Sequence, residues 1–113
     1  MTLPPYLAKT PEPPYFAVIF TSKRTARDPE GYDATADTMV EMAARMDGYL
    51  GMESTRSEDG TGITVSYWRD EAAIAAWRTV SEHLTAQKQG RENWYDSYHV
   101  RIARVTRAYS FYP

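Results

Sequence analysis

The sequence predicts one α+β domain with the element order β-α-β-β-α-β, in which two helices cover one face of a four-stranded antiparallel sheet. Three observations support this prediction. Two segments carry apolar residues at helical spacing, four segments have the apolar and β-branched composition of strands, and the two kinds follow one another in that order. The length of 113 residues fits a single domain.

The N-terminal segment 1–14 is expected to form an arm without regular structure. It holds five of the seven prolines, which block helix and ladder hydrogen bonds. Tyr6 and Leu7 are candidates to pin this arm to a surface. The domain is predicted over residues 15–113, and it begins with a strand at Tyr15–Ser22. The nearly continuous apolar run of this strand indicates burial on both faces.

A first helix is predicted to begin after Asp28 and to end before Gly48. Asp28 can cap the helix, and Pro29 suits its first position. Gly48 can adopt the left-handed conformation that ends many helices. Apolar side chains form one stripe at spacings of three and four residues: Tyr32, Ala36, Met39, Ala43 and Met46.

Two antiparallel strands are predicted next, over Tyr49–Arg56 and Gly62–Trp68. The segment Ser57–Gly62 joins them and is rich in turn-forming residues. Because side chains alternate along a strand, the second of these strands has two distinct faces, and neither carries a charge. One face holds Ile63, Val65 and Tyr67, and the other holds Thr64, Ser66 and Trp68.

A second helix is predicted to begin at Glu71, capped by Asp70, and to fade near Gly90. Its apolar stripe consists of Ala73, Trp77, Val80 and Leu84, with Ile74 and Ser81 beside it. The aromatic-rich segment Arg91–Ser97 is expected to form a turn or a short helix.

The last strand is predicted over Tyr98–Tyr109. Its apolar residues change face midway, which a bulge or a strand shared between two packing environments would explain.

One face of the predicted sheet has no helix to cover it, although the first and third strands are apolar or neutral on both faces. A second copy of the same sheet is the simplest cover, so the sequence predicts a homodimer. The alternative is a monomer in which the proline-rich arm folds over part of this face.

Composition and charge exclude several classes of function. The net charge is −2, so no basic excess exists to bind nucleic acid. The chain has no cysteine, which excludes disulfides, a thiol nucleophile and thiolate metal sites and fits a reducing cytoplasm. No apolar run has the length of a membrane span, and no signal-peptide pattern is present. We therefore expect a cytoplasmic protein without membrane contacts.

Known catalytic motifs are also missing from the sequence. The glycines of Ser57–Gly62 lack the lysine and the strand-to-helix context of a phosphate loop, and no nucleophile elbow is present. His83 and His99 do not have the spacing of metal ligands, so no metal is expected.

Three segments of the chain resemble the antibiotic biosynthesis monooxygenase domain. They are YFAVIFTS at 15–22, VSYWRDEAAIAAW at 65–77 and RENWYDSYHVRIARVTRAY at 91–109. The spacing from Trp68 to Trp77 is the most specific part. This resemblance spans Tyr15–Tyr109 and implies a ferredoxin-like protomer, a dimeric α+β barrel and a pocket between sheet and helices.

The resemblance implies three kinds of activity. Some members of the family oxidise aromatic polyketides without metal or flavin, some bind and degrade heme, and many have no established activity. The heme-degrading members use an Asn on the first strand, a Trp on the second helix and a His about three turns later. Trp77 matches this Trp, but the sequence has Ile19, Phe20 and Thr21 at the Asn region and Gln87 at the His position.

The leading hypothesis is therefore a cofactor-independent monooxygenase that binds a flat aromatic or quinone-like molecule. Trp77 and Trp68 would form the walls of its pocket, Thr21 would supply a hydrogen bond, and His83 would act as the base. Further residues predicted to bind the substrate are Phe20, Trp94, Tyr95 and His99.

Structural alternatives accompany these assignments. Trp77 is equally a large core residue, His83 a solvated or capping residue, and the aromatic segment around His99 an interface belt. The second hypothesis is a small-molecule-binding domain without catalysis. The third is heme binding or degradation with altered ligands.

Overall fold

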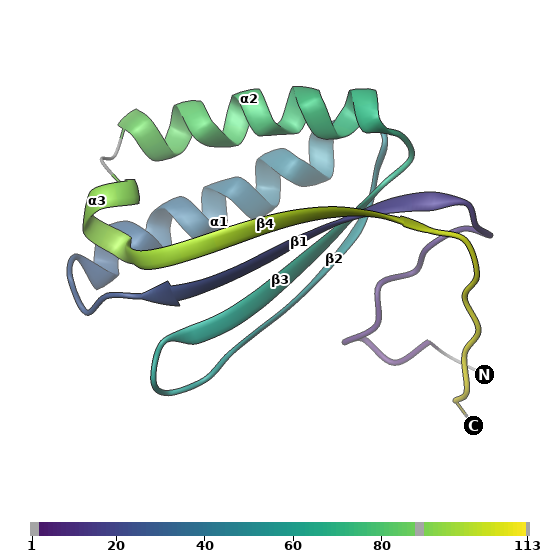
Figure 1. The fold of residues 1–113 in the computed structure, drawn as a ribbon, viewed down its shortest axis with the longest axis horizontal. Coiled ribbons are helices and arrows are strands. Elements are labelled where there is room, and N and C mark those ends of the chain that lie inside the picture. Colours follow the sequence, from purple (N-terminus) through teal and green to yellow (C-terminus); the bar gives the residue numbers. More distant parts are fainter. Residues whose placement is uncertain (1–2, 88–89, 113) are drawn as a thin grey trace.

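The computed structural model describes residues 3–87 and 90–112, so the outer ends of the predicted arm and domain, Met1–Thr2 and Pro113, lie outside the described residues. Four strands form one antiparallel sheet in the order β2-β3-β1-β4, and α1 and α2 lie on the same side of it (Figure 1). The elements in chain order are β1 (Tyr15–Arg24), α1 (Pro29–Arg45), β2 (Tyr49–Arg56), β3 (Thr61–Trp68), α2 (Glu71–Gln87), α3 (Gly90–Trp94) and β4 (Tyr95–Val105). The predicted ferredoxin-like α+β fold is confirmed.

Both predicted helix caps are present. The Asp28 carboxylate accepts a hydrogen bond from the Gly31 amide at 3.1 Å, and the Asp70 carboxylate accepts one from the Ala73 amide at 2.8 Å. These bonds satisfy amides that have no partner inside the helix. After α1 ends, Gly48 adopts a φ of +88°, as its predicted left-handed role requires.

The predicted bounds of the last strand are wrong at both ends. β4 begins at Tyr95 and ends at Val105 because its ladder partner β1 sets its limits: Arg24 pairs with Tyr95, and Tyr15 pairs with Val105. For the same reason β1 continues past the predicted end at Ser22.

Of the two explanations considered for the change of apolar face in the last strand, the register excludes a bulge in its middle. The register between β1 and β4 is continuous up to the pair Lys23–Ser97 and shifts only between Lys23 and Arg24. The aromatic segment before this strand contains the five-residue helix α3.

The core lies between the helices and the end of the sheet at which β3 finishes, around Trp68. Trp68 is fully buried there with Ala43, Ala73 and Ile74. The indole N–H of Trp68 donates to the Ser66 hydroxyl at 2.8 Å, so its one polar group is satisfied. Partly buried hydrophobic residues complete this core: Phe16, Val18, Met46, Tyr49, Met52 and Trp77.

The N-terminal arm contacts the sheet on the face away from the helices. The Ala8 amide donates to the Glu53 carboxylate at 2.9 Å, and the Tyr67 hydroxyl donates to the same carboxylate at 2.5 Å. Gly51 permits this approach, because a Cβ at that position would lie 2.9 Å from the Cβ of Ala8. The arm is therefore held by Ala8, whereas Tyr6, predicted to pin it, is exposed.

The arm thus lies over the part of this face around Gly51, Glu53 and Tyr67. On the same face, Ile63 of β3 is 43% exposed, and the β1 residues Ile19 and Thr21 are only half-buried. The predicted homodimer stays a prediction. Within the described part of the chain, no helix is long and apolar enough to cross a membrane.

Candidate functional site

Two indole rings pack against each other between the end of β3 and α2. Trp68 and Trp77 are stacked, with ring centroids 6.0 Å apart and an angle of 24° between the planes. Trp68 is fully buried, whereas Trp77 is half-buried. Trp77 thus belongs to the core through one part of its side chain and presents another part to the surface, so the two roles considered for it are compatible.

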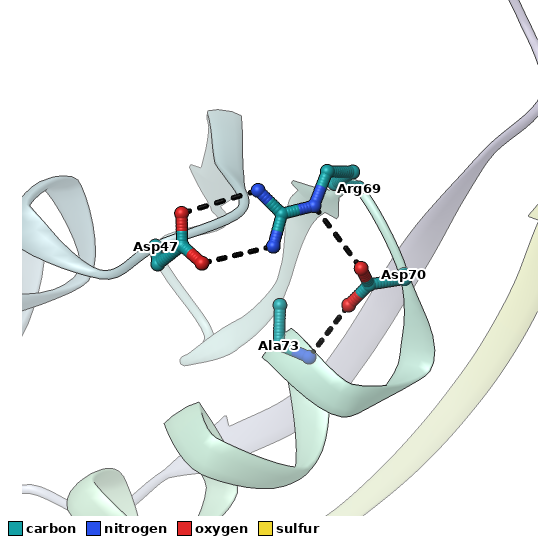
Figure 2. A network of polar contacts seen from close by, with 4 residues as sticks. All are labelled: Asp47, Arg69, Asp70 and Ala73. Carbon is teal, nitrogen blue, oxygen red and sulfur yellow. Dashed lines mark hydrogen bonds and ion pairs between the residues drawn. The ribbon is translucent and has the colours of Figure 1, made fainter.

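A polar network fixes the start of the helix that carries Trp77 (Figure 2). The Arg69 guanidinium binds both oxygens of Asp47, at 2.9 and 3.1 Å, and one oxygen of Asp70 at 3.0 Å. Asp70 at the same time caps α2 through the Ala73 amide. The Arg69 side chain holds the pKa of the Asp47 carboxyl below its usual value, and the Ala73 amide followed by Arg69 does so for Asp70.

Three apolar side chains of β4 lie on the helix-bearing face of the sheet without being covered. Side chains of directly paired residues share a face, and Tyr98, Val100 and Ile102 pair with residues of β1 that face the helices. They are nevertheless 40%, 46% and 52% exposed. We call these three residues the β4 strip.

An aromatic cluster adjoins the β4 strip near the start of β4. Phe20 is stacked on Tyr98 at 5.4 Å and meets Tyr95 edge-on at 5.5 Å. Tyr32 of α1 meets both Trp94 and Tyr95 edge-on, at 5.9 and 6.1 Å. Burial raises the pKa of the Tyr95 phenol. The structure therefore brings together the predicted residues Phe20, Trp94 and Tyr95, and Trp94 is buried, with its indole N–H donating to Asp28 at 3.1 Å.

Tyr32 is a member of this cluster that the sequence did not identify. It was predicted only as the first residue of an apolar helix stripe. Its contacts with Trp94 and Tyr95 join residues about sixty positions apart in the chain, and helical periodicity carries no information about such a distant contact.

The other predicted site residues lie elsewhere. Thr21 and His99 pair directly across β1 and β4, on the face of the sheet away from the helices. They therefore lie together, on the opposite face of the sheet from Phe20 and Trp77. His83 is exposed on α2, and its side chain makes no hydrogen bond or ion pair to any residue that the structure describes.

The β4 strip and the aromatic cluster beside it offer mainly aromatic and aliphatic groups to a ligand. Within residues 3–87 and 90–112, no three His, Asp or Glu side chains gather in a way that could hold a metal ion. A flat apolar molecule is the kind of ligand that the β4 strip and Trp77 suit, because ring faces and aliphatic groups bury such a molecule without leaving polar groups unpaired.

Comparison with known proteins extends these observations. Residues 16–89 match the family described as "Antibiotic biosynthesis monooxygenase". The chain is 54% identical over 102 residues to the "Uncharacterized protein YqjZ" of Bacillus subtilis, and the match covers 90% of this chain and 89% of that protein.

A second relative carries the name of an enzyme. The chain is 34% identical over 95 residues to the "Jasmonate monooxygenase ABM" of Pyricularia oryzae, a match that covers 80% of this chain but only 43% of that longer protein.

Among solved structures, SnoaB from Streptomyces nogalater, described as a cofactor-independent oxygenase, superposes with a TM-score of 0.68 at 11% identity. This match covers 85% of this chain and 97% of SnoaB. At that identity the likeness concerns the fold alone. The family match spans more than half of the chain, and the relative from Bacillus subtilis is matched over most of its length. This chain therefore belongs to the antibiotic biosynthesis monooxygenase family.

Proposed function

We propose that this protein is a monooxygenase that oxidises a flat aromatic or quinone-like molecule with O₂, without metal or flavin, on the helix-bearing face of its sheet. The observation that carries the proposal is the β4 strip, three apolar side chains left exposed on the helix-bearing face of the sheet in a chain of this family. The names of the jasmonate monooxygenase and of SnoaB support the reaction class.

The chemistry requires a substrate that loses a proton to give an electron-rich anion. Such an anion can reduce O₂ directly, so that a CH₂ carbon becomes a carbonyl while the second oxygen atom leaves as water. All four electrons come from the substrate, and no other reductant is needed. The contribution of the protein is to bind, orient and desolvate the substrate.

Each residue has a distinct role in this proposal. The β4 strip and Trp77 would bury the flat body of the substrate. The rings of Phe20 and Tyr95 contact the strip through Tyr98 and hold that side chain in place. His83, on the same helix as Trp77, is the side chain proposed to take the proton. Thr21 and His99 face the other side of the sheet, so we assign them to no step of this reaction.

Oxygen uptake with matched variants tests the proposal. Val100→Ser should raise KM by about threefold to tenfold, because it removes apolar contact with the substrate. Val40→Ser on α1 is the control, since Val40 is 51% exposed against 46% for Val100 but lies outside the strip. The assay follows O₂ consumption in air with a panel of anthrones and dihydroxynaphthalenes, with a chelator present.

The outcomes of this assay distinguish catalysis from binding without catalysis and from heme binding. His83→Ala should lower kcat with little change in KM if His83 takes the proton. Saturable binding of panel compounds without any O₂ uptake would favour a binding domain without catalysis. A Soret shift on titration with heme, lost in His83→Ala, would favour heme binding instead. Equal KM values for the two valine variants would show that the substrate binds elsewhere than on the β4 strip.

We also propose that the protein is a homodimer, formed through the face of the sheet away from the helices. The half-buried Ile19 and the exposed Ile63 support this proposal, because both are apolar side chains of this face that retain exposed surface. Sedimentation should give twice the chain mass of 12.9 kDa, and Ile63→Asp should shift the protein towards monomer while Val40→Asp does not. A single 12.9 kDa species at micromolar wild-type protein would contradict it.

A further inference from the structure

Two guanidinium groups surround one aromatic ring at the end of the sheet that lies far from Trp68. The Arg24 guanidinium carbon lies 3.5 Å from the centroid of the Tyr32 ring, and that of Arg56 lies 6.0 Å from the same centroid. The ring face stabilises a cation but carries no net charge. Two like charges are therefore held close together by β1, β2 and α1.

The protein supplies little negative charge to this pair. Arg56 donates to the Gly60 carbonyl at 2.5 Å and to the buried Ser22 hydroxyl at 3.0 Å, and both acceptors are neutral. The one ion pair of Arg24 among the described residues is a 3.8 Å contact with the highly exposed Asp33. The Arg24 Nε is buried and has no hydrogen-bond partner in the described part of the chain. Both cations thus retain capacity for an acceptor, and a buried N–H without one is costly.

Both arginines open onto the surface. They line a hollow of about 280 Å³ between the β1–α1 connection and the β2–β3 turn. Its other lining residues are Thr25, Ala26, Ser57, Glu58, Asp59 and Gly60. Of the two acidic residues, Asp59 is engaged by the turn itself, since its carboxylate accepts from the Thr61 amide at 2.9 Å. Glu58 is exposed and is the acidic group that would oppose an incoming anion.

We propose that the Arg24–Arg56 pair is a binding site for an oxyanion, the carboxylate or phosphate group of a small molecule that enters this hollow. Guanidinium groups bind such oxygens through paired, charge-assisted hydrogen bonds. The anion would offset the repulsion within the pair and supply acceptors for N–H groups that the protein leaves free. This site is separate from the β4 strip and does not depend on the proposed oxygenation.

An NMR titration of the ¹⁵N-labelled full chain tests the site. The probes are inorganic phosphate in one arm and benzoate in the other, each exchanged for chloride at constant ionic strength. We expect saturable shifts of the Thr25 and Gly60 amides, which line the hollow. Saturation by phosphate alone assigns the site to phosphoryl groups, and saturation by benzoate assigns it to carboxylates.

Three substitutions give the result its specificity. Arg56→Gln should weaken binding by at least about tenfold, because a hydrogen bond to a charged group is lost. Arg78→Gln is the matched control, since Arg78 is exposed on α2 and pairs with Glu82, and its binding should equal that of the wild type. Glu58→Gln should strengthen binding by about twofold to fivefold, because it removes an opposing charge.

The proposal is overturned if phosphate and benzoate both shift the amides no more than chloride does, or if Arg56→Gln binds like the wild type. Should Arg56→Gln fail to fold, Arg56→Lys replaces it, because lysine keeps the charge and loses the planar fork. Binding by Arg56→Lys should then be weaker than in the wild type, and unchanged affinity in both Arg56→Lys and Glu58→Gln would equally overturn the proposal. Activity on the β4 strip substrates is a separate readout.

Discussion

The two ends of the sheet use arginine in opposite ways. At the Trp68 end, Arg69 is 54% exposed and yet binds two carboxylates through three hydrogen bonds. At the other end, the Arg24 side chain is only 20% exposed and has a single carboxylate at 3.8 Å. Burial alone would predict the reverse, because a charge removed from water needs its partners most. Arg69 is therefore part of the scaffold, whereas Arg24 and Arg56 retain capacity for a ligand.

Aromatic residues show the same division between the two ends. Near Arg69, Trp68 is fully buried in the core, and the half-buried Trp77 stacks on it. Near Arg24, the rings of Phe20, Tyr95 and Tyr98 pack together, and Tyr98 remains 40% exposed. One end is built for stability, and the other keeps apolar surface and charge accessible.

The largest expected effect is on stability at the Trp68 end. Trp68→Ala should lower the free energy of unfolding by about 3–5 kcal/mol, because it removes a fully buried ring and leaves a cavity. Tyr98→Ala should cost about half of that or less, since much of its ring is already in water. Urea unfolding followed by far-UV circular dichroism measures both values. Equal losses would remove the distinction between the two ends.

Double-mutant cycles should give couplings of opposite sign at the two ends. The pair Arg24→Met and Arg56→Met should be more destabilising together than the sum of the single changes, by about 0.5 kcal/mol or more, because each single change relieves repulsion. Arg69→Met with Asp47→Asn should be less destabilising than the sum, because the attraction is lost only once. Urea unfolding at low ionic strength measures both cycles. A favourable coupling between Arg24 and Arg56 would show that the structure satisfies the pair without a ligand.

Local patterns in the sequence predicted most of the fold. Asp28 and Asp70 each precede a helix and cap it, and the stripe residues Ala43 and Ala73 are buried as their spacing indicated. Such features depend on neighbours within one or two helical turns. The bounds of β4 depend instead on pairing with β1, almost the whole chain away, and the local pattern predicts them wrongly.

The candidate site was predicted less well, for two different reasons. Phe20 and Thr21 were both assigned to one site, although adjacent residues of a strand point to opposite faces. The sequence contained that information, and the structure places Thr21 with His99 on the far face. The gathering of Arg24, Arg56 and Tyr32 is different in kind, because it joins β1, β2 and α1 and has no local signal.

At alkaline pH, the buried phenol of Tyr95 should change the stability of the protein more than an exposed phenol does. Burial raises the pKa of Tyr95 in the folded protein, so the stability that this group contributes is complete below the ordinary tyrosine pKa of about 10 and is lost as pH rises beyond it. Tyr95→Phe should therefore flatten the fall in stability above that pH. Tyr109→Phe is the control, because Tyr109 is 99% exposed. Chemical unfolding between pH 8 and pH 11 compares them, and identical profiles for the two variants would contradict this assignment.

The smallest expected effect concerns acid pH and the Arg69 network. Arg69 lowers the folded pKa of Asp47, so the stability contributed by this carboxylate is complete above its ordinary pKa and is lost as pH falls through the lowered value. Asp47→Asn should remove that acid dependence, whereas Asp37→Asn, an exposed residue of α1 outside the network, should retain it. Because these groups lie in water, the difference should shrink at high salt. Unfolding between pH 2 and pH 6 at low and high salt tests this point. A salt-independent difference would mean that the network is held by more than surface charge, and the contrast between the two ends of the sheet would then be sharper than burial suggests.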